Sequence, residues 1–242
     1  MPCVSLHVEL LSCSSGKEEI AAMAAKMCYS QASLEQMKDK ISASDQASFL
    51  KKILDSGHLS VLEHVSFTFG VEGVSRVLLA QLTRHRIASF SVQSQRYVSY
   101  KDGFSYIMPP NIESLGADAV QEYSRQMNEM HKWYLYWQER LSKGEKGNED
   151  ARFVLPNACE TKLVLTMNVR ELLHFFSLRC CNRAQWEIHR LADEMLKICR
   201  AEAPILFMYA GPGCVSGACP EGTKTCGLAK QVREKYEKRE LI

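Results

Sequence analysis

The spacing of hydrophobic and polar residues predicts a chain of short strands alternating with helices. Strands are predicted at residues 5–11, 65–71 and 162–167, and the alternation typical of a half-buried strand is clearest in 65–71. Helical spacing of apolar residues predicts helices at residues 17–30, 44–56, 169–179 and 184–203. The mixture predicts an α+β protein.

Cap residues place two of the helix boundaries. Ser44 is the expected N-cap of helix 44–56, and Gly57 is its expected stop. Ser75 is expected to cap a further helix that runs towards His85. The residues around His85 are therefore predicted to lie where a helix ends and a loop begins.

A long helix is predicted after Met108-Pro109-Pro110, which marks a break. Its apolar residues alternate at spacings of three and four, as in a heptad seam: Val120, Tyr123, Met127, Met130, Tyr134, Trp137 and Leu141. Such a seam needs a partner, which is either the rest of the chain or another subunit. Residues 144–150 are polar and contain glycine, and are predicted to form a loop.

The composition changes after Pro204. Residues 211–226 are rich in glycine and cysteine, and residues 230–242 form a charged tail that is expected to be a solvated helix or disordered. We therefore predict one main domain over residues 1–210, followed by a distinct C-terminal segment over 211–242.

Composition and charge limit the class of protein. The 242 residues are 46% hydrophobic, enough for a sizeable core, and the formal net charge is only +2. No apolar run approaches the roughly 20 residues that cross a bilayer, and the N-terminus lacks the features of a secretory signal. A cytoplasmic protein is expected, so the ten cysteines are interpreted as reduced thiols. The spacing of Cys214, Cys219 and Cys226 is a weak zinc signal, and no metal site is predicted.

The chemistry is concentrated in an arginine-rich window between Val74 and Tyr100, which contains no Asp, Glu or Lys. Guanidinium groups present paired donors that match phosphate or carboxylate oxygens. A purely structural salt-bridge face would need acidic partners, and the window supplies none. Because the net charge of the chain is small, the window favours a small anionic ligand over a nucleic-acid backbone.

Two further groups of polar residues accompany the window. The first lies before strand 65–71 and contains His58, Ser60, Glu63 and His64; it is read either as a helix cap with a core histidine or as part of a site. The second follows helical offsets, with Arg170 and His174 on one face, so that one ligand could meet both. No glycine-rich nucleotide loop, nucleophile elbow or zinc-protease motif is present.

The sequence Arg84-His85-Arg86, followed after seven residues by Ser94, resembles the signature of the flavin-dependent thymidylate synthases. The resemblance extends over about residues 5–210. It includes His58 and Glu63-His64, the stretch from Arg152 to Pro156, and the segment from Asn168 through Arg179 to Glu187.

The resemblance implies a fold, an activity and an assembly. The fold is an antiparallel or mixed sheet packed with long helices. The activity is the reductive methylation of dUMP to dTMP: methylenetetrahydrofolate donates the carbon and becomes tetrahydrofolate, and FAD reduced by NADPH donates the hydride. The expected assembly is a homotetramer with active sites between subunits, and no membrane or nucleic-acid partner is implied.

The resemblance also implies roles for individual residues. The expected FAD-binding residues are Ser60, Glu63, Arg84, His85, Arg86, Asn168, Arg170 and His174. The expected dUMP-binding residues are Gln81, Arg84, Ser94, Gln95, Arg96, Arg152 and Arg179. Arg179 is the expected catalytic residue, which favours ionisation of the uracil at N3, and His58 is expected near the folate and the flavin. Ser94 has no base beside it in the sequence and is assigned to binding.

The chain departs from the family pattern at three positions. His174 stands where other members carry Asn, Ser91 stands where some members have Asn, and Val92 stands where some have Glu. The alternative hypothesis is a non-catalytic protein that binds nucleotides or RNA through the same arginines. It leaves the other motif segments unexplained, and the aromatic pattern of a single-strand binder is missing.

Overall fold

The computed structural model describes residues 1–42, 45–142 and 144–237. The described residues form an α+β fold, as predicted. They divide into two compact units. Unit 1 comprises residues 1–9, 70–84 and 90–164, and unit 2 comprises residues 10–69, 85–89 and 165–242.

A four-stranded antiparallel sheet has the strand order β1-β2-β4-β3. Its strands are β1 (His7–Cys13), β2 (Ser66–Ser75), β3 (Ala88–Val92) and β4 (Glu160–Asn168). In β4, buried Leu163 and Leu165 alternate with exposed Lys162 and Val164, as the period of two requires. The three predicted strands are confirmed, whereas β3 replaces the loop that was expected after the arginines.

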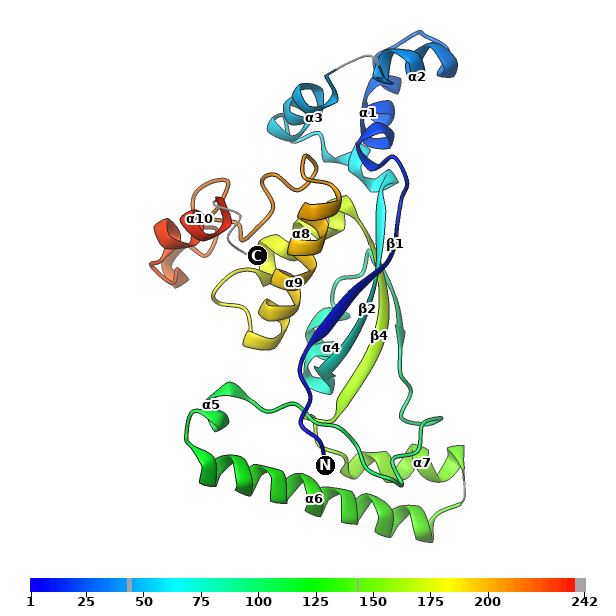
Figure 1. The fold of residues 1–242 in the computed structure, drawn as a ribbon, viewed down its shortest axis with the longest axis vertical. Helices are drawn as coiled ribbons and strands as arrows, with labels where there is room; N and C mark the ends of the chain where they lie inside the picture. The colour runs from blue at the N-terminus through cyan, green and yellow to red at the C-terminus, as the bar shows by residue number, and fades with distance from the viewer. Residues whose placement is uncertain (43–44, 143, 238–242) are drawn as a thin grey trace. The chain divides into compact units, whose positions relative to one another are not determined.

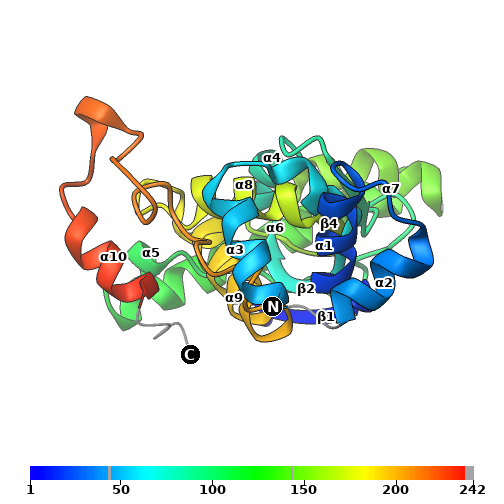
Figure 2. The same cartoon turned by 90° about the horizontal axis from the view of Figure 1, so that it is seen from above.

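The helical part of unit 2 is shown in Figures 1 and 2, in which α2 lies beside α1. Its helical segments are α1 (Lys17–Met27), α2 (Leu34–Ser42), α3 (Gln46–Asp55), the 3-10 helix η1 (Leu59–His64), α8 (Val169–Arg179), α9 (Trp186–Glu202), the 3-10 helix η3 (Gly222–Lys224) and α10 (Ala229–Glu237). The four helices predicted from apolar spacing correspond to α1, α3, α8 and α9. The predicted α8 has the observed boundaries.

Helix α2 was not predicted, although the sequence carries a signal for it. The Ser33 hydroxyl accepts a hydrogen bond from the Gln36 amide at 3.3 Å, and the Gln36 side chain accepts one from the Ser33 amide at 3.1 Å. This reciprocal pair is a capping box. The predicted cap Ser44 lies outside the described residues, and Asp45 caps α3 by accepting from the Ser48 amide at 3.2 Å.

Unit 1 is built around the long helix α6. Its helical segments are α4 (Arg76–Leu82), α5 (Pro110–Glu113), α6 (Ala117–Arg140), α7 (Glu145–Ala151) and the 3-10 helix η2 (Arg152–Val154). Ser75 caps α4, as predicted, by accepting from the Leu78 amide at 3.3 Å.

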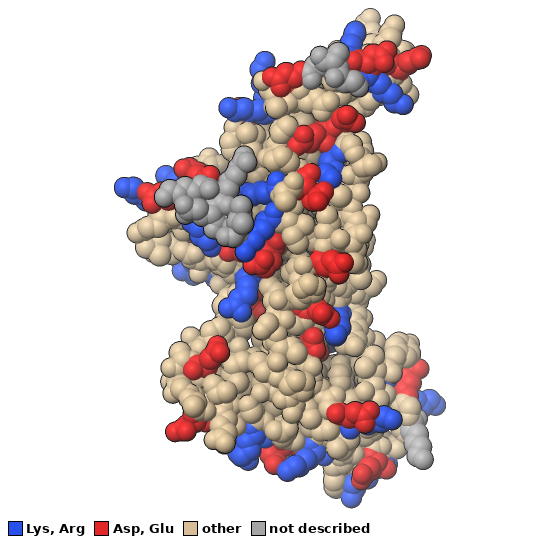
Figure 3. All heavy atoms as spheres, in the orientation of Figure 1, with Lys and Arg blue, Asp and Glu red and all other residues tan. Residues whose placement is uncertain are grey.

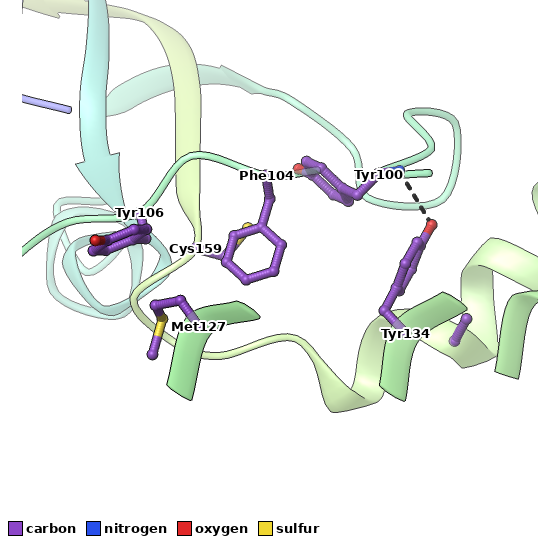
Figure 4. Packing of buried hydrophobic residues seen from close by; sticks show 7 residues of the cluster. Tyr100, Phe104, Tyr106, Met127, Tyr134 and Cys159 are labelled. Atoms are coloured by element: carbon purple, nitrogen blue, oxygen red, sulfur yellow. Dashed lines mark hydrogen bonds between the residues drawn. The ribbon is translucent and has the colours of Figure 1, made fainter. Parts of the chain in front are cut away.

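The seam of α6 faces a cluster of aromatic and sulfur-containing side chains in the same unit (Figure 4). Met127 and Tyr134 are buried there, and the Tyr134 hydroxyl accepts a hydrogen bond from the Tyr100 amide at 3.3 Å. For these residues the partner of the seam is therefore the chain itself. Trp137 is different, because 44% of its surface is exposed.

Helix α7 corrects the prediction of a loop at 144–150 and runs beside the end of α6 (Figure 1). The glycine that suggested a loop has a packing role. A Cβ atom at Gly147 would lie only 1.8 Å from the Ser142 carbonyl oxygen, so no larger residue fits there. The glycine permits a close approach and does not break the helix.

The C-terminal segment packs within unit 2. Tyr236 of α10 is 1% exposed, and its hydroxyl lies 2.6 Å from Asp193 Oδ1 and 3.1 Å from the Cys180 carbonyl oxygen, both of which are acceptors for its one proton. Val232 is buried as well. The prediction of a helix is therefore confirmed for the described part of the tail. The prediction that this helix is solvated is wrong for Val232 and Tyr236. The division into 1–210 and 211–242 stays a prediction.

We expect Asp193 to make stability depend on pH. Burial alone would raise its pKa, but hydrogen bonds from His189, Tyr236 and Lys235 outweigh burial and hold it at about 2, below the ordinary 3.8. A lowered carboxyl pKa stabilises the fold fully above the ordinary value, and this stability is lost as the pH falls towards the folded-state value. About 2 kcal/mol should be lost between pH 3.8 and 2. Denaturant unfolding of the wild type and of Asp193→Asn across this range checks it, since the variant should lack this pH dependence.

No helix in the described ranges is long and apolar enough to cross a membrane. All ten cysteines lie within the described ranges, where each is a free thiol. Among the described residues, no three His, Cys, Asp or Glu side chains are grouped so that they could hold a metal ion.

Candidate functional site

The side chain of His85 is the centre of a buried polar cluster in unit 2. His85 is 5% exposed, and each of its ring nitrogens meets a residue of α8. Nδ1 lies 3.0 Å from Glu171 Oε1, and Nε2 accepts a hydrogen bond from Arg179 Nε at 3.1 Å. Both ring nitrogens are therefore used by the protein, and a hydrogen bond from a ring nitrogen of His85 to a flavin would require one of these bonds to open.

Helix α8 positions this cluster through its cap and its period. The Asn168 side chain caps the helix by accepting from the Glu171 amide at 2.9 Å. Glu171 and Phe175, four residues apart, are buried on one face. Arg170 and His174 share the exposed face, as the helical offsets predicted. The His174 ring nevertheless lies edge-on to His85, with 5.9 Å between centroids.

The segment η1 brings the upstream residues to α8. Glu63 of η1 forms an ion pair with Arg170, and about half of each side chain is exposed. Ser60 is exposed on the same short helix. His58 precedes η1, half-buried, with its ring edge-on to Tyr29 at 6.2 Å between centroids. The predicted FAD residues of η1 and α8 are thus neighbours within unit 2.

In unit 1, Arg96 is the best-defined member of the predicted dUMP set. Its guanidinium forms ion pairs with Glu145 at 2.7 Å and Glu149 at 3.4 Å, both on α7. Arg152 donates to the Glu149 carbonyl oxygen at 3.0 Å, so Arg96 and Arg152 share a neighbour. Within the described residues, the Nε of Arg96 is buried and has no hydrogen-bond partner. An unsatisfied donor at a cationic group is suited to an anionic ligand.

Ser94 and Gln95 precede Arg96 and differ in exposure. Ser94 is half-buried, and its hydroxyl accepts a hydrogen bond from the Arg96 amide at 3.2 Å. Gln95 is buried and donates to the thiol of Cys159 at 3.7 Å. Burial raises the pKa of Cys159 to about 11, so this thiol stays protonated near neutral pH and is a poor nucleophile.

Arg84 and Arg86 flank His85 and are both exposed. Neither side chain has a hydrogen bond or an ion pair to the part of the chain that the structure describes. Their paired donors are therefore available to an oxygen-rich ligand. Gln81 is half-buried near the end of α4, where its carbonyl oxygen accepts from the Arg84 amide at 3.4 Å.

The sequence missed three acidic residues that organise these groups. Glu171 holds His85, while Glu145 and Glu149 meet Arg96. The arginine window contains no acidic residue of its own, as the sequence shows. In the folded chain, however, acidic residues from other segments contact it. The spacing of Glu171 from its cap Asn168 was a usable signal, because an acid three residues after a cap lies in the first turn of the helix. Glu145 and Glu149 gave no such signal, because they lay in the predicted loop.

Comparison with known proteins identifies the family. The model of the family "Thymidylate synthase complementing protein" matches residues 9–205. The chain belongs to this family. The matched span of the family includes all of the predicted site residues, from His58 to Arg179.

Relatives of this family are similar to nearly the whole chain. A flavin-dependent thymidylate synthase of Geobacter sulfurreducens is 49% identical over 234 residues, covering 96% of this chain and 98% of that protein. One from Clostridium tetani is 45% identical over 244 residues, with the same coverage. One from Sulfolobus acidocaldarius is 40% identical over 211 residues, covering 87% of this chain and 78% of that protein. The resemblance that the motifs suggested is confirmed.

Proposed function

We propose that the protein is an FAD-dependent thymidylate synthase that converts dUMP to dTMP. Methylenetetrahydrofolate donates the one-carbon unit and leaves as tetrahydrofolate, and NADPH is the reductant of the flavin. One observation carries the proposal: within the family match, Arg84 and Arg86 of the signature are exposed and, among the described residues, have no side-chain partners. They are donors available for anionic ligands.

The residues of unit 2 fit a flavin dinucleotide. FAD carries a pyrophosphate, which paired guanidinium donors recognise well, and Arg86 offers such donors at the surface. Ser60, His174 and the Glu63–Arg170 pair add further polar groups on η1 and α8. His85 and Asn168 are further members of the proposed FAD set. Arg84, which is exposed, belongs to both the proposed FAD set and the proposed dUMP set. When bound, the flavin supplies the hydride of the reaction.

The proposed dUMP residues bind and orient the nucleotide. Arg96 and Arg152 hold its phosphate, with Gln81, Ser94 and Gln95 as further binding residues. Within the described residues no histidine or carboxylate is hydrogen-bonded to the Ser94 hydroxyl, which supports binding over nucleophilic attack. Arg179 stabilises negative charge on the uracil as C5 becomes nucleophilic. His58 contacts the folate.

The alternative of a nucleotide- or RNA-binding protein is not favoured. Family membership explains the η1 and α8 residues, which the alternative leaves without a role. On the face shown in Figure 3, basic and acidic side chains are interspersed over the described residues. Such a surface differs from the continuous basic face that tracks a nucleic-acid backbone.

The first experiment follows the flavin without oxygen. The purified protein is mixed with FAD and NADPH, with or without dUMP, and bleaching is followed at about 450 nm, a wavelength at which oxidised flavins absorb. We expect bleaching that dUMP accelerates, and dTMP once methylenetetrahydrofolate is added. A protein that neither binds FAD nor forms dTMP would contradict the proposal.

We also propose the homotetramer that the resemblance implies, with active sites between subunits. Light scattering of the FAD-loaded protein checks the assembly. A monomer that forms dTMP would contradict the assembly while leaving the activity in place.

A further inference from the structure

The hydrogen bonds around His85 define which ring nitrogen carries its proton. The Nε of arginine always carries a hydrogen and never accepts, so His85 Nε2 must present its lone pair to Arg179. A neutral imidazole has one N–H group, which is then on Nδ1 and donates to Glu171. The three side chains therefore form a directed chain in which Arg179 donates to His85 and His85 donates to Glu171.

The surroundings keep the imidazole neutral. Burial is the largest influence and lowers the pKa of His85; the Arg179 guanidinium acts in the same direction, while the hydrogen bond to Glu171 raises it. The net result is a pKa below the ordinary 6.5. Phe175 packs against the His85 imidazole in a T-shaped arrangement, with 5.0 Å between the two ring centroids. The contact with Glu171 is thus a hydrogen bond to a neutral ring rather than an ion pair.

Stability alone is a poor explanation for Glu171. Only 8% of its side chain is exposed, and in the described residues its carboxylate has one hydrogen bond, to a neutral partner. Removing a carboxylate from water costs several kcal/mol, which one neutral donor does not offset. An apolar residue of similar size would fill the same space without this cost.

We propose that Glu171 is a positioning residue that holds Arg179 in its working orientation through the Nδ1–H tautomer of His85. The inference rests on the proposed function, in which Arg179 stabilises charge on the pyrimidine. The carboxylate fixes the proton on Nδ1, the lone pair on Nε2 accepts from Arg179, and the guanidinium is thereby held at its Nε. Without Glu171 the proton moves freely between the ring nitrogens, and the Nε2–H tautomer turns a donor towards Arg179.

The test combines nitrogen NMR with kinetics on the FAD-loaded protein. Histidine labelled with nitrogen-15 should show the Nδ1–H tautomer for His85 in the wild type and a mixture in Glu171→Met. The Met variant removes a buried charge but leaves the His85 Nδ1–H without its acceptor, which destabilises the folded state, so melting is recorded alongside the kinetics. Its kcat should fall by about 10- to 100-fold, the loss typical when an orienting partner is removed, while KM for dUMP and flavin absorbance change little.

Two further variants separate positioning from a structural role. In Glu171→Gln an amide oxygen can still accept from Nδ1–H, so part of the kcat and of the tautomer signal should return. Glu187→Met removes another buried carboxylate, on α9, and should leave the His85 tautomer unchanged. In the wild type, kcat should fall at low pH over the range in which His85 becomes protonated. The imidazolium has no lone pair and cannot accept the hydrogen bond from Arg179.

The outcomes are distinguishable. The inference is overturned if His85 of the wild type at neutral pH carries its proton on Nε2 or is doubly protonated. It is also overturned if Glu171→Met changes the His85 tautomer but leaves kcat unchanged. If the unaltered protein binds FAD but forms no dTMP, the proposed function fails, and the positioning role fails with it. The NMR result on the tautomer still stands in that case.

Discussion

Replacing Arg179 by alanine should abolish measurable dTMP formation while the flavin absorbance of the protein stays nearly intact. The guanidinium is proposed to stabilise negative charge that develops on the pyrimidine, and loss of one such donor lowers kcat by about 100- to 1000-fold. Product assays at saturating FAD, NADPH, methylenetetrahydrofolate and dUMP measure the effect. Flavin binding should survive because Arg179 is not in the proposed FAD set.

The controls for Arg179 address folding and charge. The alanine variant leaves the buried Nε2 of His85 unpaired, which costs about 1–3 kcal/mol, so melting should be recorded alongside activity. Arg183→Ala is a matched control, because Arg183 is exposed near the end of the same helix and bonds to Glu221 and to the Lys224 carbonyl. It should leave dTMP formation unchanged. Full activity in Arg179→Ala would remove the pyrimidine-activating role.

The second large effect is expected at Arg96, whose substitution by alanine should weaken dUMP binding by about 10- to 100-fold. A hydrogen bond to a charged group contributes about 1.5–3 kcal/mol, and each 1.4 kcal/mol is a factor of ten. The partnerless Nε of Arg96 among the described residues is a donor that a phosphate oxygen would satisfy. Calorimetry with dUMP and with deoxyuridine, which lacks the phosphate, measures the effect. The loss should appear for dUMP and be small for deoxyuridine.

The two glutamates beside Arg96 provide the converse experiment. Glu145 and Glu149 pair with the Arg96 guanidinium, so they would compete with the phosphate that is proposed to bind there. Glu145→Gln should therefore tighten dUMP binding without weakening its salt dependence, whereas Arg96→Ala should weaken that salt dependence. Arg125→Ala is the control, because Arg125 lies exposed on α6 and pairs with Glu122. Equal affinities for dUMP in the wild type and Arg96→Ala would show that the phosphate binds elsewhere.

Much of the candidate site was predictable because its residues lie close together in the sequence. The run from Arg84 to Arg96 and the helical offsets in α8 place their members without knowledge of the tertiary fold. The organisation of these residues was not predictable. His85 was assigned to FAD from the motif, and that assignment stays a prediction, but the structure shows both ring nitrogens engaged by residues 86 and 94 positions away along the chain.

The errors in the fold prediction have local physical causes. Gly147 was interpreted as a loop signal, whereas it permits close packing inside α7. Tyr236 was placed in a solvated tail because its neighbours are charged, whereas the hydroxyl reaches Asp193 and the Cys180 carbonyl. The close contact at Gly147 is local, because Ser142 precedes it by five residues, but it depends on the path of the backbone and not on composition. The contacts of Tyr236 are with residues 43 and 56 positions away along the chain, which no local count of polar residues contains.

The α+β class, the main strands and helices, the signature arginines and the family can all be derived from the order of the residues alone. Periodicity, caps and motifs are local, and a short window contains all the information that they need. The pairing of acidic with basic side chains depends on the folded chain. Glu171 selects the tautomer of His85, and Glu145 and Glu149 neutralise Arg96, because folding brings together groups that are distant along the chain. Electrostatic energy depends on distance in space and on burial, so the charge state of the site follows from the fold.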